Sequence, residues 1–301
     1  MAVLKDIWRV GIVRAAPEAV LAPGALARLP VTWLPPQGPL RFIADPFGLW
    51  RDGRLNVFVE AYDYRDRHGV IEAYVLDEAL EVLERRTVLR EPWHLSYPFV
   101  FEAEGATWML PEAFRSGGLT LYRAEAFPDR WAAATRIELD DVAIDATSVF
   151  HDGLWWLFYA PAGASAADKI GRLHLAWAER LTGPWRTHPG NPVRRDVRSS
   201  RPGGTPFVGA DGRLVLPVQD CARTYGGAIR PLRISVLTPD RFEAEAGEPL
   251  VPPAAFGAYT DGLHTLSAAG PVTLIDAKRR VITLKSLSLD ARREAGRLLR
   301  R

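Results

Sequence analysis

Acidic side chains recur at two fixed steps along this 301-residue chain, next to short apolar runs. Asp45 precedes Gly53 by eight residues, and Glu60 follows Gly53 by seven. The same spacing through a glycine recurs four more times. Its first and second positions hold Tyr97 and Glu112, Asp145 and Ala160, Gly204 and Gln219, and Gly262 and Ala277. We expect these two positions to carry the chemistry of the protein.

The polar groups at these positions would be costly to bury without a purpose, because a charge at the end of an apolar strand must be paired or functional. One interpretation is structural: Asp45 and Asp145 cap turns, while Glu60 and Glu112 pair with arginines between repeats. The other, which we favour for the whole set, is a ligand site of converging carboxyl groups. Side chains at or beside the same positions would then bind the ligand, namely Tyr97, Arg201, Gln219, Asp220, Asp261 and His264.

Each copy of the repeat predicts a strand, a tight glycine turn and a second strand, as in Leu154-Trp155-Trp156-Leu157-Phe158-Tyr159. In four copies a third apolar stretch follows, such as 119–124. Four strands about every fifty residues, without a long helical period between them, are typical of propeller blades. We therefore predict an all-β chain that forms a single five-bladed β-propeller domain over residues 1–301. It would have about four antiparallel strands per blade, with blades starting near residues 42, 94, 142, 200 and 258.

The N-terminal segment is expected to close the ring. Residues 7–13 read as a strand before the first copy, and the last copy is short of outer strands. An N-terminal strand that completes the fifth blade would join the two ends of the ring and remove its exposed edges. The innermost strands of all blades then converge on one axial funnel, so equivalent positions of the repeat become neighbours.

Composition excludes several classes of function. The chain has 38 basic and 36 acidic side chains, a balance that does not favour nucleic acid as a partner. The basic tail, 290–301, is expected to be a solvated terminal helix. A lone Cys221 excludes an internal disulfide, and charged residues interrupt the apolar N-terminal stretch, so neither a signal peptide nor a transmembrane segment is predicted. A cytoplasmic protein is the default expectation.

Other catalytic motifs are weak in this sequence. The histidines form no HxxxH pattern and have no paired cysteines, so no zinc or other metal site is predicted. The Gly-Gly pairs lack the strand–loop–helix context of phosphate loops, and no GxSxG motif is present.

Several short motifs resemble a known family. Ala44-Asp45-Pro46 is similar to the start of the first blade in the five-bladed furanosidases of glycoside hydrolase family 43. A larger set of motifs comprises Ser96-Tyr97-Pro98-Phe99-Val100-Phe101, Met109-Leu110-Pro111-Glu112, Gly183-Pro184-Trp185, His188-Pro189, Asn191-Pro192, Arg201-Pro202-Gly203-Gly204 and Gln219-Asp220. Through these motifs the chain, over roughly residues 40 to 265, more closely resembles the N-terminal domain of glucosamine inositolphosphorylceramide transferase and its bacterial stand-alone relatives. In the plant transferase a glycosyltransferase domain follows the propeller, and 301 residues leave no room for it, so transferase activity does not simply carry over.

The furanosidase resemblance implies an inverting mechanism. Asp45 would be the general base, Asp145 would tune pKa and orientation, and Glu112 or Glu60 would be the general acid. The family places its acid in a later blade, where this chain has Arg201-Pro202-Gly203-Gly204. The resemblance requires no cofactor, but His264 matches a histidine that faces a central ion in many relatives, which implies a central calcium ion or an ordered water there.

The leading hypothesis is a carbohydrate-active enzyme that cleaves or transfers a glycosyl unit in the funnel, in glycolipid or surface polysaccharide metabolism. The alternative is a non-catalytic glycan-binding or scaffold propeller. Aromatic stacking on the sugar would come from Trp93, Trp155 and Trp156. A phosphate or carboxylate of the ligand would meet Arg201, Arg223 and Tyr225, which favours a sugar nucleotide or a lipid-linked glycan.

Overall fold

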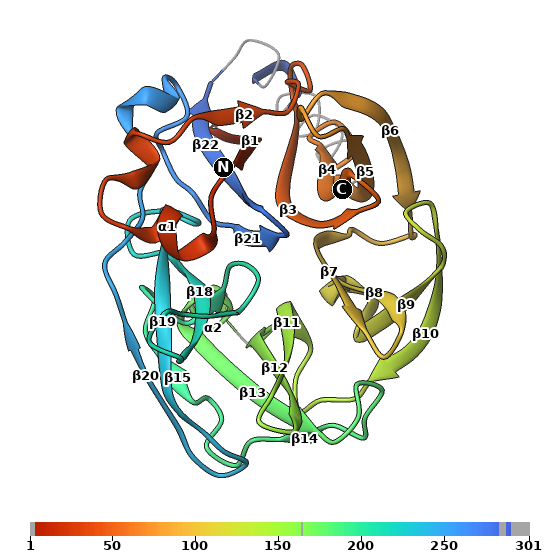
Figure 1. Cartoon of the computed structure of the whole chain (residues 1–301), viewed down its shortest axis with the longest axis vertical. Coiled ribbons are helices and arrows are strands. Elements are labelled where there is room, and N and C mark those ends of the chain that lie inside the picture. Colours follow the sequence, from red (N-terminus) through yellow and green to blue (C-terminus); the bar gives the residue numbers. More distant parts are fainter. Residues whose placement is uncertain (1–3, 164, 283–286, 290–301) are drawn as a thin grey trace, which may run out of the picture.

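The computed structural model describes residues 4–163, 165–282 and 287–289. Within them, five antiparallel sheets stand around a common axis like the blades of a propeller (Figure 1). Three sheets have four strands, and two have a fifth, short strand beside the main path. The predicted all-β, five-bladed propeller is therefore confirmed.

The blades follow one another along the chain, each running from the axis outward. Blade one contains β3 (Arg41–Arg51), β4 (Arg54–Asp63), β5 (His68–Leu76) and β6 (Val82–Leu89), and blade two contains β7 (Ser96–Ala103), β8 (Ala106–Glu112), β9 (Leu119–Ala126) and β10 (Arg130–Ile137). Blade three contains β11 (Ala143–His151), β12 (Leu154–Pro161), β13 (Arg172–Ala178), β14 (Arg186–Thr187) and the extra β15 (Arg194–Arg195). Blade four contains β16 (Arg201–Pro202), β17 (Phe207–Val208), β18 (Leu214–Asp220), β19 (Ala228–Leu237) and β20 (Phe242–Ala246).

Blade five closes the ring with strands from both ends of the chain. From the axis outward it contains β21 (Leu266–Ala269), β22 (Val272–Val281), β1 (Lys5–Val13) and β2 (Val31–Trp33). The β1–β22 ladder runs without a break from the pair Lys5 and Val281 to the pair Val13 and Thr273. The expected closure by the N-terminal strand is confirmed, whereas the basic tail 290–301 lies outside the described residues.

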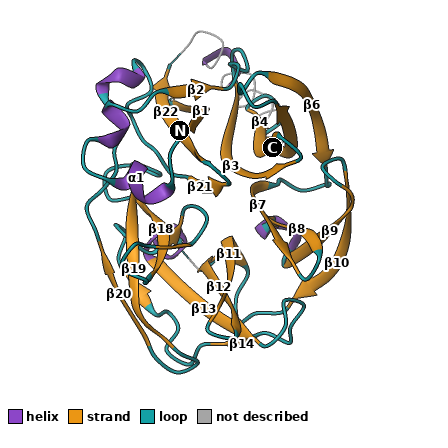
Figure 2. Ribbon diagram, in the orientation of Figure 1, coloured by secondary structure: helices purple, strands orange, loops and turns teal. Residues whose placement is uncertain are grey.

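Apart from a helical segment at 287–289, the helices in the described residues are short and lie in the connections between strands (Figure 2). They are α1 (Pro17–Leu21), α2 (Ala166–Gly171) and the 3₁₀ turns η1 (Ala25–Ala27), η2 (Phe114–Ser116) and η3 (Ala254–Phe256).

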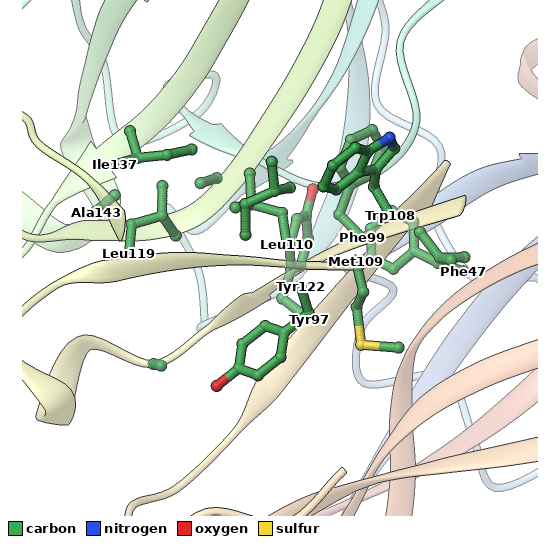
Figure 3. Close-up of a cluster of buried hydrophobic side chains, with 14 of the residues drawn as sticks. Phe47, Tyr97, Phe99, Trp108, Met109, Leu110, Leu119, Tyr122, Ile137 and Ala143 are labelled. Carbon is green, nitrogen blue, oxygen red and sulfur yellow. The ribbon is translucent and has the colours of Figure 1, made fainter. Parts of the chain in front are cut away.

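The largest hydrophobic cluster fills the space between neighbouring blades (Figure 3). Phe47 of β3 packs edge-on against Tyr97 and Phe99 of β7, with ring centroids 4.7 and 5.5 Å apart. Trp155 and Trp156 are buried in such clusters, and Trp93 packs against the same core. The structure therefore assigns these three tryptophans to packing, contrary to the expectation that they stack on a sugar.

Candidate functional site

Blades one to three turn the same inner-strand residue in the same unusual way. Asp45, Tyr97 and Asp145 have φ angles of 51°, 44° and 51°, and each lies at an irregularity in the pairing of the first two strands. A positive φ strains a residue other than glycine, and a bulge redirects the local side chain. Strain repeated at one position of three blades indicates that this position is built for a purpose.

In blade five the first register position belongs to His264. Gly262 forms a backbone bridge with Lys278, and Leu266 pairs with Ile275. The spacing of the repeat in the sequence predicts Gly262 at this position. The observed pairing instead places there the residue two positions later in the chain. His264 therefore occupies the place that the bulged residues have in the other blades.

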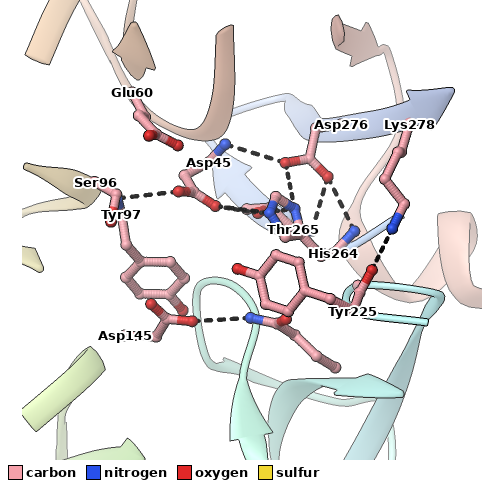
Figure 4. A network of polar contacts seen from close by, with 12 residues as sticks. Asp45, Glu60, Ser96, Tyr97, Asp145, Tyr225, His264, Thr265, Asp276 and Lys278 are labelled. Carbon is pink, nitrogen blue, oxygen red and sulfur yellow. Dashed lines mark hydrogen bonds and ion pairs between the residues drawn. The ribbon is translucent and has the colours of Figure 1, made fainter. Parts of the chain in front are cut away.

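A funnel pocket of about 380 Å³ opens where these positions meet. It brings together six of the predicted residues, which are Asp45, Glu60, Glu112, Arg201, Tyr225 and His264. Asp145 and Gln219 are buried beside them and are joined by a hydrogen bond of 2.9 Å between Gln219 Nε2 and Asp145 Oδ2. Figure 4 shows the carboxyl groups of Asp45 and Glu60 on blade one and of Asp145 on blade three, turned toward this region.

Asp145 is held by blade four. Arg201 Nε donates to Asp145 Oδ2 at 2.7 Å, and Gln219 Nε2 donates to the same oxygen. Burial alone would lower the pKa of Arg201, but the neighbouring Asp145 outweighs it and raises that pKa. The guanidinium also lies 5.2 Å from the centre of the Tyr225 ring. The arginine that replaces the expected acid of blade four is thus the charge partner of Asp145.

His264 is held between two carboxyl groups. Its Nδ1 lies 2.7 Å from Asp276 Oδ2, and its Nε2 lies 3.4 Å from Asp45 Oδ1. Burial alone would lower the pKa of His264, but Asp276 and Asp45 outweigh burial and raise it, which favours the charged imidazolium. Trp8 of β1 stacks on the imidazole at 3.7 Å between ring centroids, so the closing strand also covers the site.

Asp45 is tied to both adjacent blades. Its Oδ2 accepts a hydrogen bond of 3.2 Å from the backbone N–H of Tyr97, and its Oδ1 accepts one of 3.3 Å from Thr265 Oγ1. Burial raises the pKa of Asp45 to about 6, against the opposing effect of His264. Asp45 thus accepts a hydrogen bond from the backbone, as the structural interpretation expected. The donor lies on the next blade, however, and Asp45 also lines the pocket.

The implied calcium site would involve the same residues. Ligand atoms of Asp45, His264 and Asp276 lie within 4.8 Å of one another. However, the Asp276 carboxylate already accepts hydrogen bonds from the backbone N–H groups of Asp45, His264 and Thr265 and from the His264 ring. Calcium requires six to eight oxygen ligands. With the Asp276 oxygens occupied and a charged imidazolium between the carboxyl groups, these residues do not fit a calcium site.

Glu112 receives its hydrogen bonds from neutral groups. Its Oε2 accepts from Ser96 Oγ at 2.7 Å and its Oε1 from the backbone N–H of Phe114 at 2.6 Å. Burial, reinforced by the charge of Asp145, raises the pKa of Glu112 to about 7.

Glu60 is buried in a similar environment. Burial raises its pKa well above the ordinary range, and the charges of Asp45 and Glu112 add to the effect. His94 Nε2 lies 3.4 Å from Glu60 Oε1, but burial lowers the pKa of His94 to about 4, so this imidazole is neutral near pH 7. The structural interpretation of the sequence expected both glutamates to pair with arginines. Among the described residues, neither glutamate has an arginine within ion-pair distance.

Comparison with known proteins assigns a family to this architecture. The family model described as glucosamine inositolphosphorylceramide transferase 1, N-terminal, matches residues 35–251. The chain belongs to this family. Curated relatives named glucosamine inositolphosphorylceramide transferase 1 are 36% identical over 208 residues in Oryza sativa subsp. indica and 35% identical over 207 residues in Arabidopsis thaliana. The matches cover 68% of this chain but only 28% and 27% of those relatives, so the chain spans little more than a quarter of their length.

Solved structures share the fold of this family member at low sequence identity. A family 117 glycoside hydrolase from Zobellia galactanivorans aligns with a TM-score of 0.54 and 14% identity, over 82% of this chain and 86% of that one. An α-L-arabinofuranosidase from Podospora anserina aligns with a TM-score of 0.55 and 11% identity, over 81% and 92% of the two chains. Among the described residues of this family member, no helix is both long and apolar enough to cross a membrane.

Three of the predicted site residues lie away from the funnel pocket in this family member. Asp220 and Asp261 line a second pocket, where they bond to arginine side chain or backbone. The Tyr97 hydroxyl contacts Thr147 Oγ1 at 2.9 Å and accepts from the backbone N–H of Gly204 at 2.8 Å. Tyr97 therefore braces blades three and four from inside the core.

Sequence reasoning missed several residues of the site. Asp276 anchors His264, Trp8 covers it, and the ring of Tyr62 faces His94 in the pocket wall. For Asp276 a signal was present, because the residue lies in the apolar run 272–277, and a carboxyl group inside a buried strand requires a partner. No comparable signal distinguishes Trp8 from a core tryptophan.

Proposed function

We propose that the funnel pocket binds a carbohydrate and that Asp45 and Glu112 catalyse the cleavage or transfer of a glycosyl unit. The observation that carries this proposal is the set of buried carboxyl groups from different blades that face one pocket with differently shifted pKa values. Burial costs that packing does not require are typical of functional sites. The proposal extends to glycolipid or surface polysaccharide metabolism, which the names of the curated relatives favour.

The two carboxyl groups suit complementary roles. With a pKa of about 7, Glu112 holds its proton in a substantial fraction of molecules at neutral pH, as a general acid must. With a pKa of about 6, Asp45 is mostly ionised there and can accept a proton from water or an acceptor hydroxyl. Glu60 is the second candidate for the acid. Asp145, held by Arg201, places a charge near Asp45 and Glu112.

The wall of the pocket supports a sugar ligand. Phe42, Tyr62 and Tyr64 form an aromatic cluster on blade one, and Trp8 and Tyr225 line the pocket from other elements. Aromatic faces beside hydrogen-bonding carboxyl groups match the apolar faces and hydroxyl groups of a sugar. A volume of about 380 Å³ lies within the range of small-ligand sites.

Conservative substitutions test the reaction. We expect Asp45→Asn and Glu112→Gln to lower turnover by roughly 10²–10⁴-fold, because a positioned acid or base contributes that much, while ligand binding is retained. Glu60→Gln should have a smaller effect if Glu112 is the acid. Turnover would be measured on a panel of glycosides and sugar nucleotides, and binding by calorimetry. Glu102→Gln, at an exposed glutamate paired with Arg51, is the matched control.

A non-catalytic glycan-binding propeller is the second candidate. It is favoured by the saturation of the funnel carboxyl groups, since both Asp45 oxygens and Asp145 Oδ2 already contact protein donors. Saturable glycan binding without turnover in the parent protein would support this candidate and contradict catalysis. Absence of both binding and turnover on the panel would contradict the carbohydrate proposal as a whole.

A further inference from the structure

A second pocket of about 570 Å³ lies beside blades four and five and is rich in arginine. Four arginines line it against two acidic residues, so the lining carries an excess of positive charge. We call it the arginine pocket, and its charged residues are Arg198, Arg223, Arg230, Arg280, Asp220 and Asp261. The rest of the wall is largely apolar and includes Pro249, Pro252 and the exposed Val251.

The arginines differ in how firmly the protein holds them. Arg230 is fully engaged, since its Nε donates to Asp220 Oδ2 at 2.9 Å and its Nη1 to the backbone oxygen of Gly247 at 2.9 Å. Arg280 is held loosely, with its Nε 3.8 Å from Asp261 Oδ1. The Arg223 side chain has neither a hydrogen bond nor an ion pair with any residue in the described part of the chain. Arg223 and Arg280 can therefore bind an incoming anion without breaking a strong internal pair.

One loop separates the arginine pocket from the funnel. In the segment 221–227 between β18 and β19, Arg223 and Thr224 line the arginine pocket, whereas Tyr225 lines the funnel. Lys278, whose side chain is fully buried, holds this loop by donating to Thr224 Oγ1 at 3.2 Å and to the backbone oxygen of Tyr225 (Figure 4). The two pockets are thus fixed next to each other, on either side of a few residues.

We propose that the arginine pocket binds a phosphate or diphosphate group of the ligand whose glycosyl unit enters the funnel. This inference rests on the proposed function, which it sharpens to a phosphorylated carbohydrate. Guanidinium groups bind phosphate oxygens through paired, charge-assisted hydrogen bonds. The apolar wall leaves room for the group that the phosphate carries. A sugar nucleotide and a lipid-linked glycan with a phosphodiester share this chemistry.

Inorganic pyrophosphate is the probe for the pocket itself. We expect calorimetry to show saturable binding that weakens as ionic strength rises. Arg223→Ala and Arg280→Ala should each weaken it roughly tenfold or more, as expected for loss of a hydrogen bond to a charged group. Arg54→Ala, at an exposed arginine at the start of β4, is the matched control and should bind like the parent. Absence of saturable binding, or equal affinity in all variants, would overturn the proposal.

Further measurements distinguish a sugar nucleotide from a lipid as the source of the phosphate. They also distinguish failure of the arginine-pocket proposal from failure of the funnel proposal. Binding of UDP that Arg223→Ala weakens supports a sugar nucleotide, and sedimentation with phosphatidylglycerol vesicles that the same change weakens supports a lipid phosphodiester. If neither probe responds to Arg223→Ala, the proposal fails. Glu112→Gln should keep the parent affinity for pyrophosphate. Loss of turnover in that variant therefore reports on the funnel alone, whatever the arginine pocket does.

Discussion

The two halves of the funnel treat buried carboxyl groups in opposite ways. In the half built by blades three to five, each buried aspartate has a cation beside it: Arg201 bonds to Asp145, and His264 bonds to Asp276. In the half built by blades one and two, Glu112 accepts hydrogen bonds from a hydroxyl and a backbone N–H. Comparable burial is therefore compensated by charge on one side and by neutral donors on the other.

This difference supports the proposed division of the pocket into an acid and a base. A buried carboxyl group without a cation retains its proton to higher pH, because desolvation penalises only its charged form. Accordingly the pKa of Glu112 is raised to about 7 by burial. Asp45 lies at the boundary, on blade one but beside the imidazolium of His264, and burial raises its pKa only to about 6. The separation of these pKa values is the basis for the proposed roles of Glu112 as acid and Asp45 as base.

The largest expected effect comes from breaking the Arg201–Asp145 charge pair, in the half built by blades three to five. Arg201→Leu would leave Asp145 buried without its cation, so we expect the free energy of unfolding to fall by about 3–5 kcal/mol. Urea denaturation measures this change. Adding Asp145→Asn to Arg201→Leu should recover part of the loss, since the uncompensated charge is then removed.

An exposed ion pair supplies the control for that measurement. Arg130 pairs with Glu125 at 2.8 Å on the surface of blade two, where both side chains are more than half exposed. Arg130→Leu should change the free energy of unfolding by less than about 1 kcal/mol. Equal losses in Arg130→Leu and Arg201→Leu would contradict the view that burial gives the Asp145 pair its weight.

A somewhat smaller effect is expected from removing the charge of Glu112, in the half built by blades one and two. The folded-state pKa of Glu112 lies above its ordinary value, so the folded protein binds more protons than the unfolded chain between about pH 4.5 and 7. Stability must then fall as pH rises through this interval, by roughly 3 kcal/mol for this group. Glu112→Gln should abolish that part of the pH dependence, which urea denaturation at pH 5 and pH 8 would measure.

The outcome at pH 8 is the most diagnostic for Glu112. The stability of the variant minus that of the parent should be larger at pH 8 than at pH 5, because at pH 8 only the parent has an ionised, buried glutamate. Glu102→Gln, at an exposed site, should leave the pH dependence unchanged. If the stability of the parent and of the Glu112→Gln variant changes by the same amount from pH 5 to pH 8, the raised pKa is contradicted.

The architecture could be predicted because it is encoded by local repetition. Glycine turns at a constant distance from apolar strands fix the length of each hairpin, and repetition of the hairpin fixes the number of blades. The error of register at Gly262 arose because β21 is only four residues long. A count from the glycine turn therefore reaches the wrong residue, although the neighbouring His264 was already among the candidates.

The chemistry of the site could be predicted only in part. Sequence spacing identified that Asp45, Glu60, Glu112 and His264 meet, since equivalent positions in a ring are neighbours. It could not show which carboxyl group would receive a cation, because that depends on side-chain reach between blades. The choice of Arg201 as partner of Asp145 is of this kind, as is the separation of Asp220 from the funnel.

The smallest expected effect concerns the boundary between the halves. His264 lowers the pKa of Asp45 against the larger effect of burial, so His264→Gln should raise that pKa from about 6 by about one unit, equivalent to roughly 1.4 kcal/mol. Carboxyl ¹³C shifts in protein labelled at aspartate would follow the titration. His94→Gln is the matched control, because burial lowers the pKa of His94 to about 4 and this imidazole carries no charge when Asp45 titrates. If both variants shift Asp45 equally, or if His264→Gln lowers its pKa, then the imidazolium does not separate Asp45 from the two glutamates.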